Sequence, residues 1–351
     1  MQTIRYILYP FSLLYGLGVY IRNKCYAIGL LKSSEFDIPV ISIGNLEVGG
    51  SGKTPFTEYI VRLLYKKNSV ATLSRGYGRV TVGFRWVDAV DDASLCGDEP
   101  LQIKNNFPDI GVAVCEDRAQ GVNRIKDTHD IVIMDDAYQH QAIKPGLSIL
   151  LFDYNRVNNN RLLLPAGNYR EPFASRKRAD VLVITKCPYV ISASDKAQII
   201  KKIKPFKHQK VLFSGIAYAD ELQAVLHHKD TFLMAHITPN TSILLLTGIA
   251  KPELLLAKLK SKTPLIIHHK YADHHKFSQK NINKLINQFK AIKAAQKIII
   301  TTQKDAMRLK NPAFEQQLLG LPLYQININM VLLGDDKLIL ENTILDYVNK
   351  Y

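Results

Sequence analysis

Residues 41–59 read ISIGNLEVGGSGKTPFTEY and join an apolar run to a glycine-rich loop and a helical pattern. The loop ends in the Gly-Lys-Thr of a phosphate-binding loop, whose usual pattern is G-x-x-x-x-G-K-[ST]. That pattern requires a glycine where Glu47 stands, and the nearest earlier glycine is Gly44. We therefore expect the loop to open in a different way, with Gly44 and Asn45 making the turn.

The sequence on either side of this loop supports nucleotide binding. An apolar β-forming run, residues 39–43, comes before the loop, and a segment with apolar residues at helical spacing follows it. In a strand–loop–helix unit of this kind, backbone N–H groups and the helix N-terminus surround phosphate oxygens. The alternative is a chance GSGKT sequence in an unrelated loop. The residues that we predict to bind the nucleotide are Gly49, Gly50, Ser51, Gly52, Lys53 and Thr54.

A Mg²⁺ ion in such a protein is held by the threonine of the loop and by an acid at the end of a neighbouring strand. The Thr54 hydroxyl is placed to reach the ion, and Lys53 would supply a positive charge to the terminal phosphates. The stretch DIVIMDD places Asp135 and Asp136 directly after an apolar β-forming run. We predict that both aspartates lie at the metal site. A strand that ends in a solvated acidic turn is the alternative.

Length and composition indicate a globular α/β protein of about two domains. The chain has 351 residues, of which 47% are hydrophobic and 22% are charged. Short β-rich runs alternate with helical patterns from residue 38 to about 205, which predicts a P-loop NTPase-like, mostly parallel sheet flanked by helices. After residue 205, further strand-like runs occur, with helical patterns between them. We predict an N-terminal segment at 1–34, a P-loop core at 35–205 and a smaller C-terminal α/β domain at 206–351.

Net charge and cysteine spacing narrow the class of partner and the compartment. The formal charge of +15 requires an anionic partner, such as nucleic acid, acidic lipid or a phosphorylated substrate. Because the chain contains no recognisable nucleic-acid-binding module, we expect no nucleic-acid partner. The four cysteines are far apart and form no C-x-x-C pair, which argues against a zinc knuckle or a disulfide framework and fits a reducing cytosol.

The N-terminal segment combines basic and apolar residues. The first 34 residues contain four basic side chains and no acidic one. The apolar stretch between Arg5 and Arg22 is shorter than the ~20 residues of a membrane-spanning helix, and Pro10, Gly16 and Gly18 interrupt it. We interpret the stretch as a helix that lies in the headgroup region of a membrane. A helix packed on the protein's own core is the alternative.

Phosphate transfer to an alcohol would need a group that accepts the proton of the alcohol. The stretch CGDEP offers Asp98 and Glu99 just before an apparent helix, where a carboxylate could also act only as a cap. The stretch HHKYADHHKF places four histidines close together, among them His274 and His275. We interpret them as histidines that orient or protonate a catalytic carboxylate. A zinc cluster and solvated surface histidines are the alternatives.

A further dense stretch reads LPAGNYREPFASRKRAD. Arg170 and Glu171 in this stretch could bind phosphate and metal, respectively. The basic residues that follow, 176–178, would suit an anionic substrate. A basic surface loop is the alternative interpretation.

Many short motifs together resemble those of tetraacyldisaccharide 4′-kinases, the lipid A 4′-kinases. They occur in the order seen in that family, from about residue 38 to 308, and the N-terminal helix resembles the membrane-associating segment of the family. The glycine loop alone would not identify the family, whereas so many motifs in one order do. The motifs are GNLEVGGSGKTP, SRGYGR, GDEP, IMDDAYQH, LLPAGNYREP, RADVLVITK, TGIAKP, ADHH and TTQKDAMR.

The resemblance implies an activity, a location and a set of site residues. It implies transfer of the ATP γ-phosphate to the 4′-hydroxyl of a tetraacylated glucosamine disaccharide 1-phosphate, which yields lipid IVA. It also implies that Asp98 acts with His274 or His275 as a catalytic pair. The Mg²⁺ site would comprise Thr54, Asp135, Asp136 and Glu171. The substrate-binding residues would be Asn45, Arg75, Tyr77 and Arg170.

A lipid substrate also places the enzyme at a membrane. Its acyl chains hold it in the bilayer by roughly 0.8 kcal/mol per buried CH₂ group, so the enzyme must come to the surface. We expect a peripheral or monotopic protein on the cytoplasmic face of the bacterial inner membrane, with no obligate protein partner.

The chain departs from the family pattern at two places. Many members have Asp-Asp-Gly-Phe-Gln where this chain has residues 135–139, DDAYQ. Many members also have an acidic residue where Gln303 stands, which leaves no role for an acid at 303.

The alternative function is a MinD/ParA-like membrane-associated ATPase switch, whose loop also reads G-G-x-G-K-T. Those proteins place a lysine early in the loop, whereas Val48 precedes Gly49 here.

Overall fold

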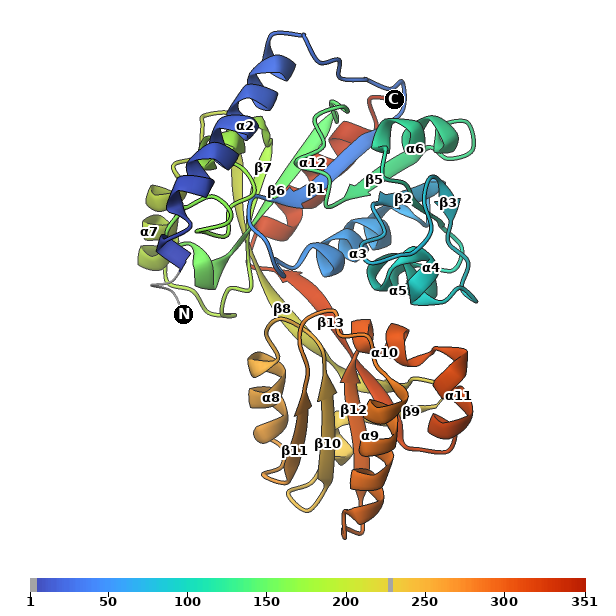
Figure 1. The fold of residues 1–351 in the computed structure, drawn as a ribbon. Helices are drawn as coiled ribbons and strands as arrows, with labels where there is room; N and C mark the ends of the chain where they lie inside the picture. Colours follow the sequence, from blue (N-terminus) through green and yellow to red (C-terminus); the bar gives the residue numbers. More distant parts are fainter. Residues whose placement is uncertain (1–4, 227–229) are drawn as a thin grey trace.

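The computed structural model describes residues 5–226 and 230–351, which form two lobes that share one sheet (Figure 1). The helices and strands of the first lobe surround the phosphate loop. The second lobe lies beyond the open end of that loop, and two long strands connect the lobes.

The first lobe contains a parallel sheet whose strands coincide with the runs predicted from the sequence. The parallel strands are β1 (Val40–Asn45), β2 (Val70–Ser74), β4 (Gly111–Val114), β5 (Ile131–Asp135), β6 (Leu147–Asp153) and β7 (Val181–Thr185). A short edge strand, β3 (Arg85–Trp86), pairs antiparallel with β4. The helices are α3 (Lys53–Leu64), α4 (Ala93–Cys96), α5 (Asp98–Asn106), α6 (Arg118–Ile125) and α7 (Ala193–Ile203), with the 3₁₀ turns η1 (Tyr154–Arg156) and η2 (Phe173–Arg178).

Helices cover both faces of this sheet, which explains why its strands are apolar almost throughout. All residues of β1 are buried. Ile43 of β1 belongs to the same apolar cluster as Phe56 of α3 and Leu101 of α5. Val40, which points to the other face, belongs to a cluster with Val122 of α6. The prediction of a two-sided α/β sheet is therefore confirmed.

The second lobe is a smaller α/β unit, and four of its strands coincide with the strand-like runs predicted after residue 205. Its strands are β8 (Lys210–Ala224), β9 (Thr231–Leu233), β10 (Ser242–Thr247), β11 (Ile266–Lys270), β12 (Lys297–Thr302) and β13 (Leu323–Leu332). Its helices are α8 (Glu253–Lys260), α9 (Gln279–Ala291), α10 (Gln303–Leu309) and α11 (Pro312–Leu318), with the 3₁₀ turn η3 (Met234–His236). Strands β10 to β13 run parallel, and β13 pairs antiparallel with β8.

Strand β8 belongs to both lobes. The 13 strands form one sheet in the order β11-β10-β12-β13-β8-β7-β6-β1-β5-β2-β4-β3, with β9 paired to β8. The first part of β8 pairs parallel with β7, from Lys210 to Phe213, and the rest pairs antiparallel with β13, from Ser214 to Ala224. The sequence did not reveal this long shared strand.

The last helix, α12 (Asp336–Val348), returns to the first lobe. The Tyr347 hydroxyl accepts a hydrogen bond from the N–H of Val40 at 2.9 Å, and Tyr59 of α3 donates to Glu341 at 2.7 Å. The domain boundary near residue 205 stays a proposal. Within residues 206–351, α12 packs on the first lobe.

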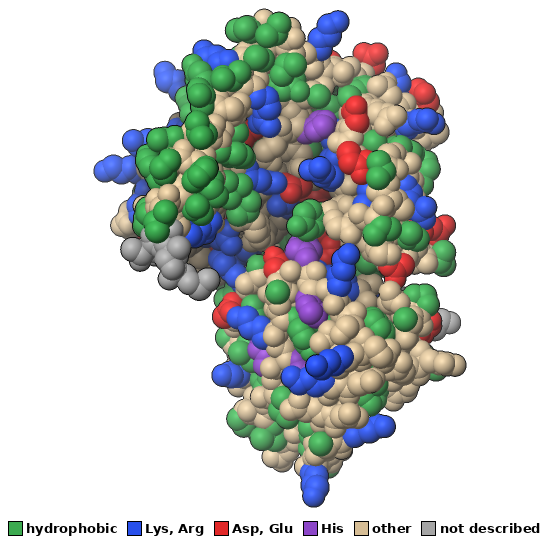
Figure 2. Space-filling view, viewed as in Figure 1, with side chains coloured by type: hydrophobic (Ala, Val, Ile, Leu, Met, Phe, Trp, Pro, Cys, Tyr) green, Lys and Arg blue, Asp and Glu red, His purple; other side chains and the backbone are tan. Residues whose placement is uncertain are grey.

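The N-terminal helix, α2 (Tyr9–Ala27), is continuous through Gly16 and Gly18. The expectation that Pro10 and the glycines interrupt it was wrong, because Pro10 lies in the first turn, where its missing N–H has no helical partner to lose. The helix buries Ser12 and Val19 and leaves most of its large apolar side chains exposed, such as Leu14 at 67%. Figure 2 shows apolar side chains gathered along this helix. Most of its apolar surface therefore does not pack on the protein's own core. Among the described residues, no helix is both long and apolar enough to span a bilayer.

Gly44 has a different role from the one expected. Gly44 and Asn45 are the last residues of β1 and not the turn of the phosphate loop. A Cβ atom on Gly44 would lie 2.6 Å from Tyr138 Cβ and 2.9 Å from the Tyr138 backbone nitrogen. The glycine is needed there because the chain that follows β5 passes directly against β1.

Gly44→Ala should therefore destabilise the protein. A methyl group forced against Tyr138 should lower the free energy of unfolding by about 1–3 kcal/mol, measured as a lower urea midpoint with an unchanged slope. Gly18→Ala is the matched control, because a Cβ on Gly18 meets no atom within 4 Å and alanine favours a helix. Equal midpoints for the two variants would contradict the close approach.

Candidate active site

The phosphate loop contains one buried side-chain hydroxyl that has no hydrogen-bond partner in the part of the chain that the structure describes. Gly52 begins α3 in the left-handed region, with φ of 86°, so a side chain would be strained there. Ser51 and Thr54 are buried, and Ser51 Oγ has no hydrogen-bond partner among the described residues. A buried hydroxyl without a partner costs free energy. A phosphate oxygen in the loop would provide that partner.

Lys53 lies in a polar group that joins three of the predicted site residues. Its Nζ is 3.3 Å from Asn45 Oδ1 and 3.6 Å from Asp136 Oδ1. Arg170 donates to both Asp136 oxygens, at 2.7 and 3.2 Å, and also to Asn45 Oδ1. Burial would raise the pKa of Asp136, but Lys53 and Arg170 lower it to about 2. Asp136 is therefore ionised at neutral pH and held by two cations.

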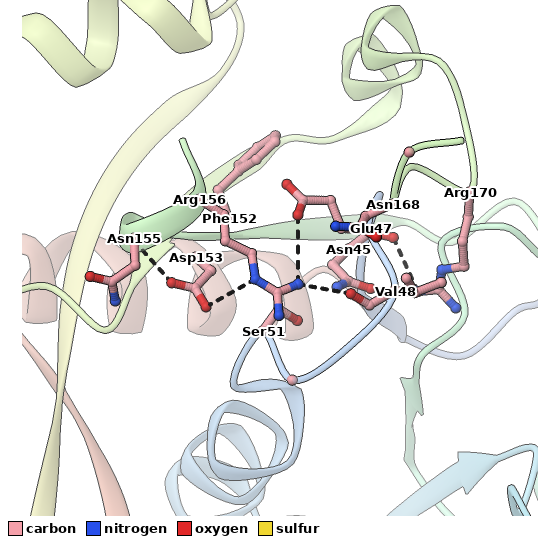
Figure 3. A network of polar contacts seen from close by, with 12 residues as sticks. Asn45, Glu47, Val48, Ser51, Phe152, Asp153, Asn155, Arg156, Asn168 and Arg170 are labelled. Carbon is pink, nitrogen blue, oxygen red and sulfur yellow. Dashed lines mark hydrogen bonds and ion pairs between the residues drawn. The ribbon is translucent and has the colours of Figure 1, made fainter. Parts of the chain in front are cut away.

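Figure 3 shows how the chain accommodates Glu47 in place of the usual glycine. Glu47 is 9% exposed, and its carboxylate lies 3.7 Å from Arg156 Nη1, which also donates to the carbonyl of Val48 at 2.8 Å. Arg156 Nε is 3.8 Å from Asp153 Oδ2. Burial raises the pKa of Glu47, whereas the hydrogen bond from Tyr169 and the charge of Arg156 lower it. An ion pair thus fixes the opening of the loop.

Asp135 has the environment of a carboxylate that lacks a cation. It is 2% exposed, and its Oδ1 has no hydrogen-bond partner among the described residues. Burial raises its pKa to about 7, with Glu99 acting in the same direction and Lys53 in the opposite one. A divalent cation would stabilise the ionised form. Asp135, together with the Thr54 hydroxyl, therefore fits a Mg²⁺ site.

The described residues contain no group of three or more His, Cys, Asp or Glu side chains that could hold a metal ion alone. This agrees with the usual mode of Mg²⁺ binding, in which one or two carboxylates share the ion with phosphate oxygens and water.

A second polar group lies where the two lobes meet. Asp98, the first residue of α5, is 5% exposed, and its Oδ2 is 3.2 Å from Nδ1 of His274, which follows β11. Arg308 of α10 binds the same Asp98 oxygen and lies 3.3 Å from His274 Nδ1. Burial would raise the pKa of Asp98, but the hydrogen bond from His274 and the charges of Lys304 and Arg308 hold it well below its usual range. The hydrogen bond to Asp98 raises the pKa of His274.

The two adjacent histidines of the ADHH motif lie in different surroundings. His274 has a φ of 55°, a left-handed conformation that is uncommon for a residue with a side chain. His275 stacks on Tyr271, with ring centroids 4.5 Å apart, and its Nε2 is 3.0 Å from Asn281 Oδ1. It is therefore His274, and not His275, that contacts Asp98.

Glu171 does not join the other residues predicted for the metal site. It is fully buried, and its two carboxylate oxygens bind different arginines. One oxygen lies 2.5 Å from Arg22 of α2, and the other binds Arg178. Because both oxygens are occupied by guanidinium groups, this geometry gives Glu171 a structural contact with α2 in place of a metal contact.

Two residues predicted to bind substrate lie on the loop after β2. The Tyr77 side chain is 71% exposed, and its ring centroid is 5.3 Å from that of His274. Arg75 is also exposed. Near it lies Arg118, a buried residue that the sequence analysis did not select. Burial lowers the pKa of Arg118 to about 10, and the charge of Asp136 acts in the opposite direction.

Lys304 and Arg308, both from the TTQKDAMR motif, are further site residues that the sequence analysis did not select. Lys304 donates to the Glu99 carboxylate. Burial would lower its pKa, but the charges of Glu99, Asp98 and Asp135 raise it well above its usual range. The charge of Lys304 therefore acts on both Asp98 and Asp135. Lys304 and Arg308 follow directly after the apolar strand β12. This position could have identified them as site residues from the sequence, because strand ends gather at one edge of a parallel sheet.

Comparisons with known proteins identify the family of this chain. The LpxK family, described as tetraacyldisaccharide-1-P 4′-kinase, matches residues 4–348. The chain belongs to this family. A tetraacyldisaccharide 4′-kinase of Phocaeicola vulgatus is 38% identical, over 98% of this chain and 95% of the relative. One of Flavobacterium johnsoniae is 41% identical over 94% of each chain.

A solved structure of the same family has the same fold. It is LpxK from Aquifex aeolicus in complex with ATP, which is 27% identical with a TM-score of 0.75, over 98% of this chain and 99% of that one. The predicted family and fold class are therefore confirmed.

Arg308→Gln should change the pH dependence of the kinase. Loss of a cation beside Asp98 and His274 raises the pKa of both groups, because each is then more easily protonated. We expect the acidic limb of the kcat/KM profile to move to higher pH by roughly one unit. Lys337→Gln removes the same charge from an exposed position of α12 and is the control. An acidic limb that stays in place in the Arg308 variant would contradict the assignment.

Proposed function

We propose that this chain transfers the γ-phosphate of ATP to the 4′-hydroxyl of a tetraacylated glucosamine disaccharide 1-phosphate, which yields lipid IVA. The observation that carries this proposal is the contact of Asp98 with His274 across the lobes. A switch ATPase has no need for a pair that activates an alcohol, so this contact favours the kinase.

ATP would bind with its phosphates on the backbone amides of residues 49–54 and on Lys53. The unpaired Ser51 hydroxyl and the left-handed Gly52 support this placement. Thr54, Asp135 and Asp136 would hold Mg²⁺, which neutralises charge on the β- and γ-phosphates when it is bound. Asp136 would also orient Lys53 and Arg170, which it already contacts.

The 4′-hydroxyl would give its proton to His274. Nδ1 of His274 faces Asp98. Nε2 is therefore the ring nitrogen that would take the proton from the 4′-hydroxyl. Asp98 is a weak base because its pKa is low, but its buried charge fixes the ring and stabilises the imidazolium that forms. Tyr77, beside the His274 ring, would contact the sugar. The remaining task of the site is to place the hydroxyl in line with the γ-phosphate.

The exposed apolar face of α2 supports docking on the leaflet that contains the lipid acceptor. Phe11, Leu14 and Leu17 are each more than half exposed, whereas the polar Ser12 is buried. Val19 is also buried, but most of the large apolar side chains of α2 are exposed, which is unusual for a helix that packs on its own protein. With the basic residues of the same segment, α2 would lie at the headgroup level of an anionic membrane. ATP would then reach the site from water, on the cytoplasmic face.

Substitution of the two adjacent histidines tests the proposed base. We expect His274→Ala to reduce kcat by about 10²- to 10⁴-fold, the usual contribution of a positioned general base. His275→Ala should retain most of the activity, because His275 contacts only Tyr271 and Asn281 among the site residues described above. Transfer of radiolabelled phosphate from ATP to the disaccharide acceptor in detergent micelles is the measurement. A wild-type protein that folds but transfers no phosphate would end the proposal, and equal losses in the two variants would remove His274 from it.

Substitution on the exposed face of α2 tests the membrane contact. Leu14→Glu should weaken binding to anionic phospholipid vesicles by about tenfold or more, since a buried leucine contributes about 1.5–3 kcal/mol. Leu319→Glu is the matched control, because Leu319 is 53% exposed in the second lobe and the charge change is the same. Co-sedimentation with vesicles measures both. Equal vesicle binding by the two variants would contradict a role of α2 at the surface.

A further inference from the structure

A short segment, residues 162–171, lies between α2 and the phosphate loop, and we call it the strap. On its α2 side, Ser12 Oγ donates to the carbonyl of Leu163 at 3.0 Å and accepts from the N–H of Ala166 at 2.9 Å. A Cβ atom on Gly16 would lie 2.8 Å from Leu163 Cδ1, so the helix and the strap approach closely. Ser12 is buried in this contact. The buried hydroxyl of Ser12 thus binds the strap through two hydrogen bonds.

The other side of the strap pairs with the first residues of the phosphate loop. The N–H of Val48 donates to the carbonyl of Asn168 at 2.8 Å, and the N–H of Arg170 donates to the carbonyl of Leu46 at 2.7 Å. The backbone of the loop is therefore held by the backbone of the strap. A displacement of the strap would move the loop opening with it.

Arg170 and Glu171, at the end of the strap, contact different parts of the protein. Arg170 reaches the phosphate site, where it pairs with Asp136 at 2.7 Å. Its neighbour Glu171 is fully buried and pairs with Arg22 of α2 at 2.5 Å, while Arg178 binds its other oxygen. The Tyr15 hydroxyl of α2 also donates to the carbonyl of Arg170, at 2.9 Å.

We propose that Arg22 is a positioning residue for the nucleotide site: through Glu171 it fixes the strap, and the strap holds the phosphate loop and Arg170 in place. The contact between Arg22 and Glu171 is the side-chain ion pair between α2 and the strap. Because Glu171 is fully buried, removing a guanidinium group that faces it would cost free energy. When Arg22 is removed, Arg178 still neutralises part of this charge, so the strap shifts without unfolding. Docking of α2 and binding of ATP then depend on one shared segment.

This inference deepens the proposed function and rests on it. It differs from a general role of α2 in membrane attraction, because it predicts an effect on ATP affinity when no membrane is present. Lys24 separates the two roles. It carries the same charge on the same helix but is exposed, and it has no contact with the strap among the described residues.

The experiment compares R22Q with K24Q, as full-length proteins in detergent micelles. Binding of a fluorescent ATP analogue with Mg²⁺ is titrated, and kcat and KM for ATP are measured with saturating lipid acceptor. We expect the dissociation constant of the ATP analogue to be about tenfold higher in R22Q than in K24Q, because a displacement of about 1 Å in a binding site has effects of this order or larger. Vesicle binding should fall equally in both variants, since each loses one positive charge.

Two further variants keep the test decisive. R22K retains the charge but not the fork of two donors, so it should recover ATP affinity in part. Adding E171Q to R22Q should cause no further loss of ATP affinity, because the two residues act through one contact. If R22Q fails to fold by circular dichroism, R22K against K24Q decides the question in the same way. Equal ATP affinities in the Arg22 and Lys24 variants would overturn the inference, while a wild-type protein without lipid kinase activity would overturn the proposed function instead.

Discussion

The position of the second lobe is set by the pairing of a single strand with two partners. Residues 210–213 of β8 continue the parallel sheet of the first lobe, and residues 214–224 pair antiparallel with β13. Because parallel strands end at one edge, β8 carries the chain past the edge at which the phosphate loop opens. The second lobe must therefore lie opposite that loop. All cross-lobe contacts of the site, including that of Asp98 with His274, depend on this arrangement.

Charge in the site is balanced locally, although the whole chain has a net charge of +15. Two acidic residues of the site face cations that come from other elements. Asp136 faces Lys53 and Arg170, and Asp98 faces Arg308. Asp135 is the exception, because its Oδ1 has no partner among the described residues and its pKa is raised to about 7. Among these three carboxylates, Asp135 is thus the one whose charge an added cation would balance.

The sequence was sufficient to predict the strands of the first lobe, because apolar β-forming runs followed by polar turns are a local signal. The sequence assigned Lys53 to the nucleotide, Asp136 to the metal and Arg170 to phosphate or substrate, and in the structure these three side chains contact one another. It could not assign Glu47, whose partner Arg156 lies far along the chain. Nor could it choose between the adjacent histidines, because the left-handed φ of His274 is set by tertiary contacts. Strand β8 was missed because it has no pattern that separates its two halves.

The reversed surface of α2 has a consequence for the protein in water. Its leucines and aromatic side chains are exposed, while its serine is buried against the strap. Rotating the helix to hide the apolar face would break the hydrogen bonds of Ser12 and the ion pair of Arg22. The molecule therefore cannot cover this surface by itself, and away from lipid or detergent it will bind amphiphiles or associate with other copies. The contacts that hold the strap against α2 are thus the same contacts that keep this apolar surface exposed.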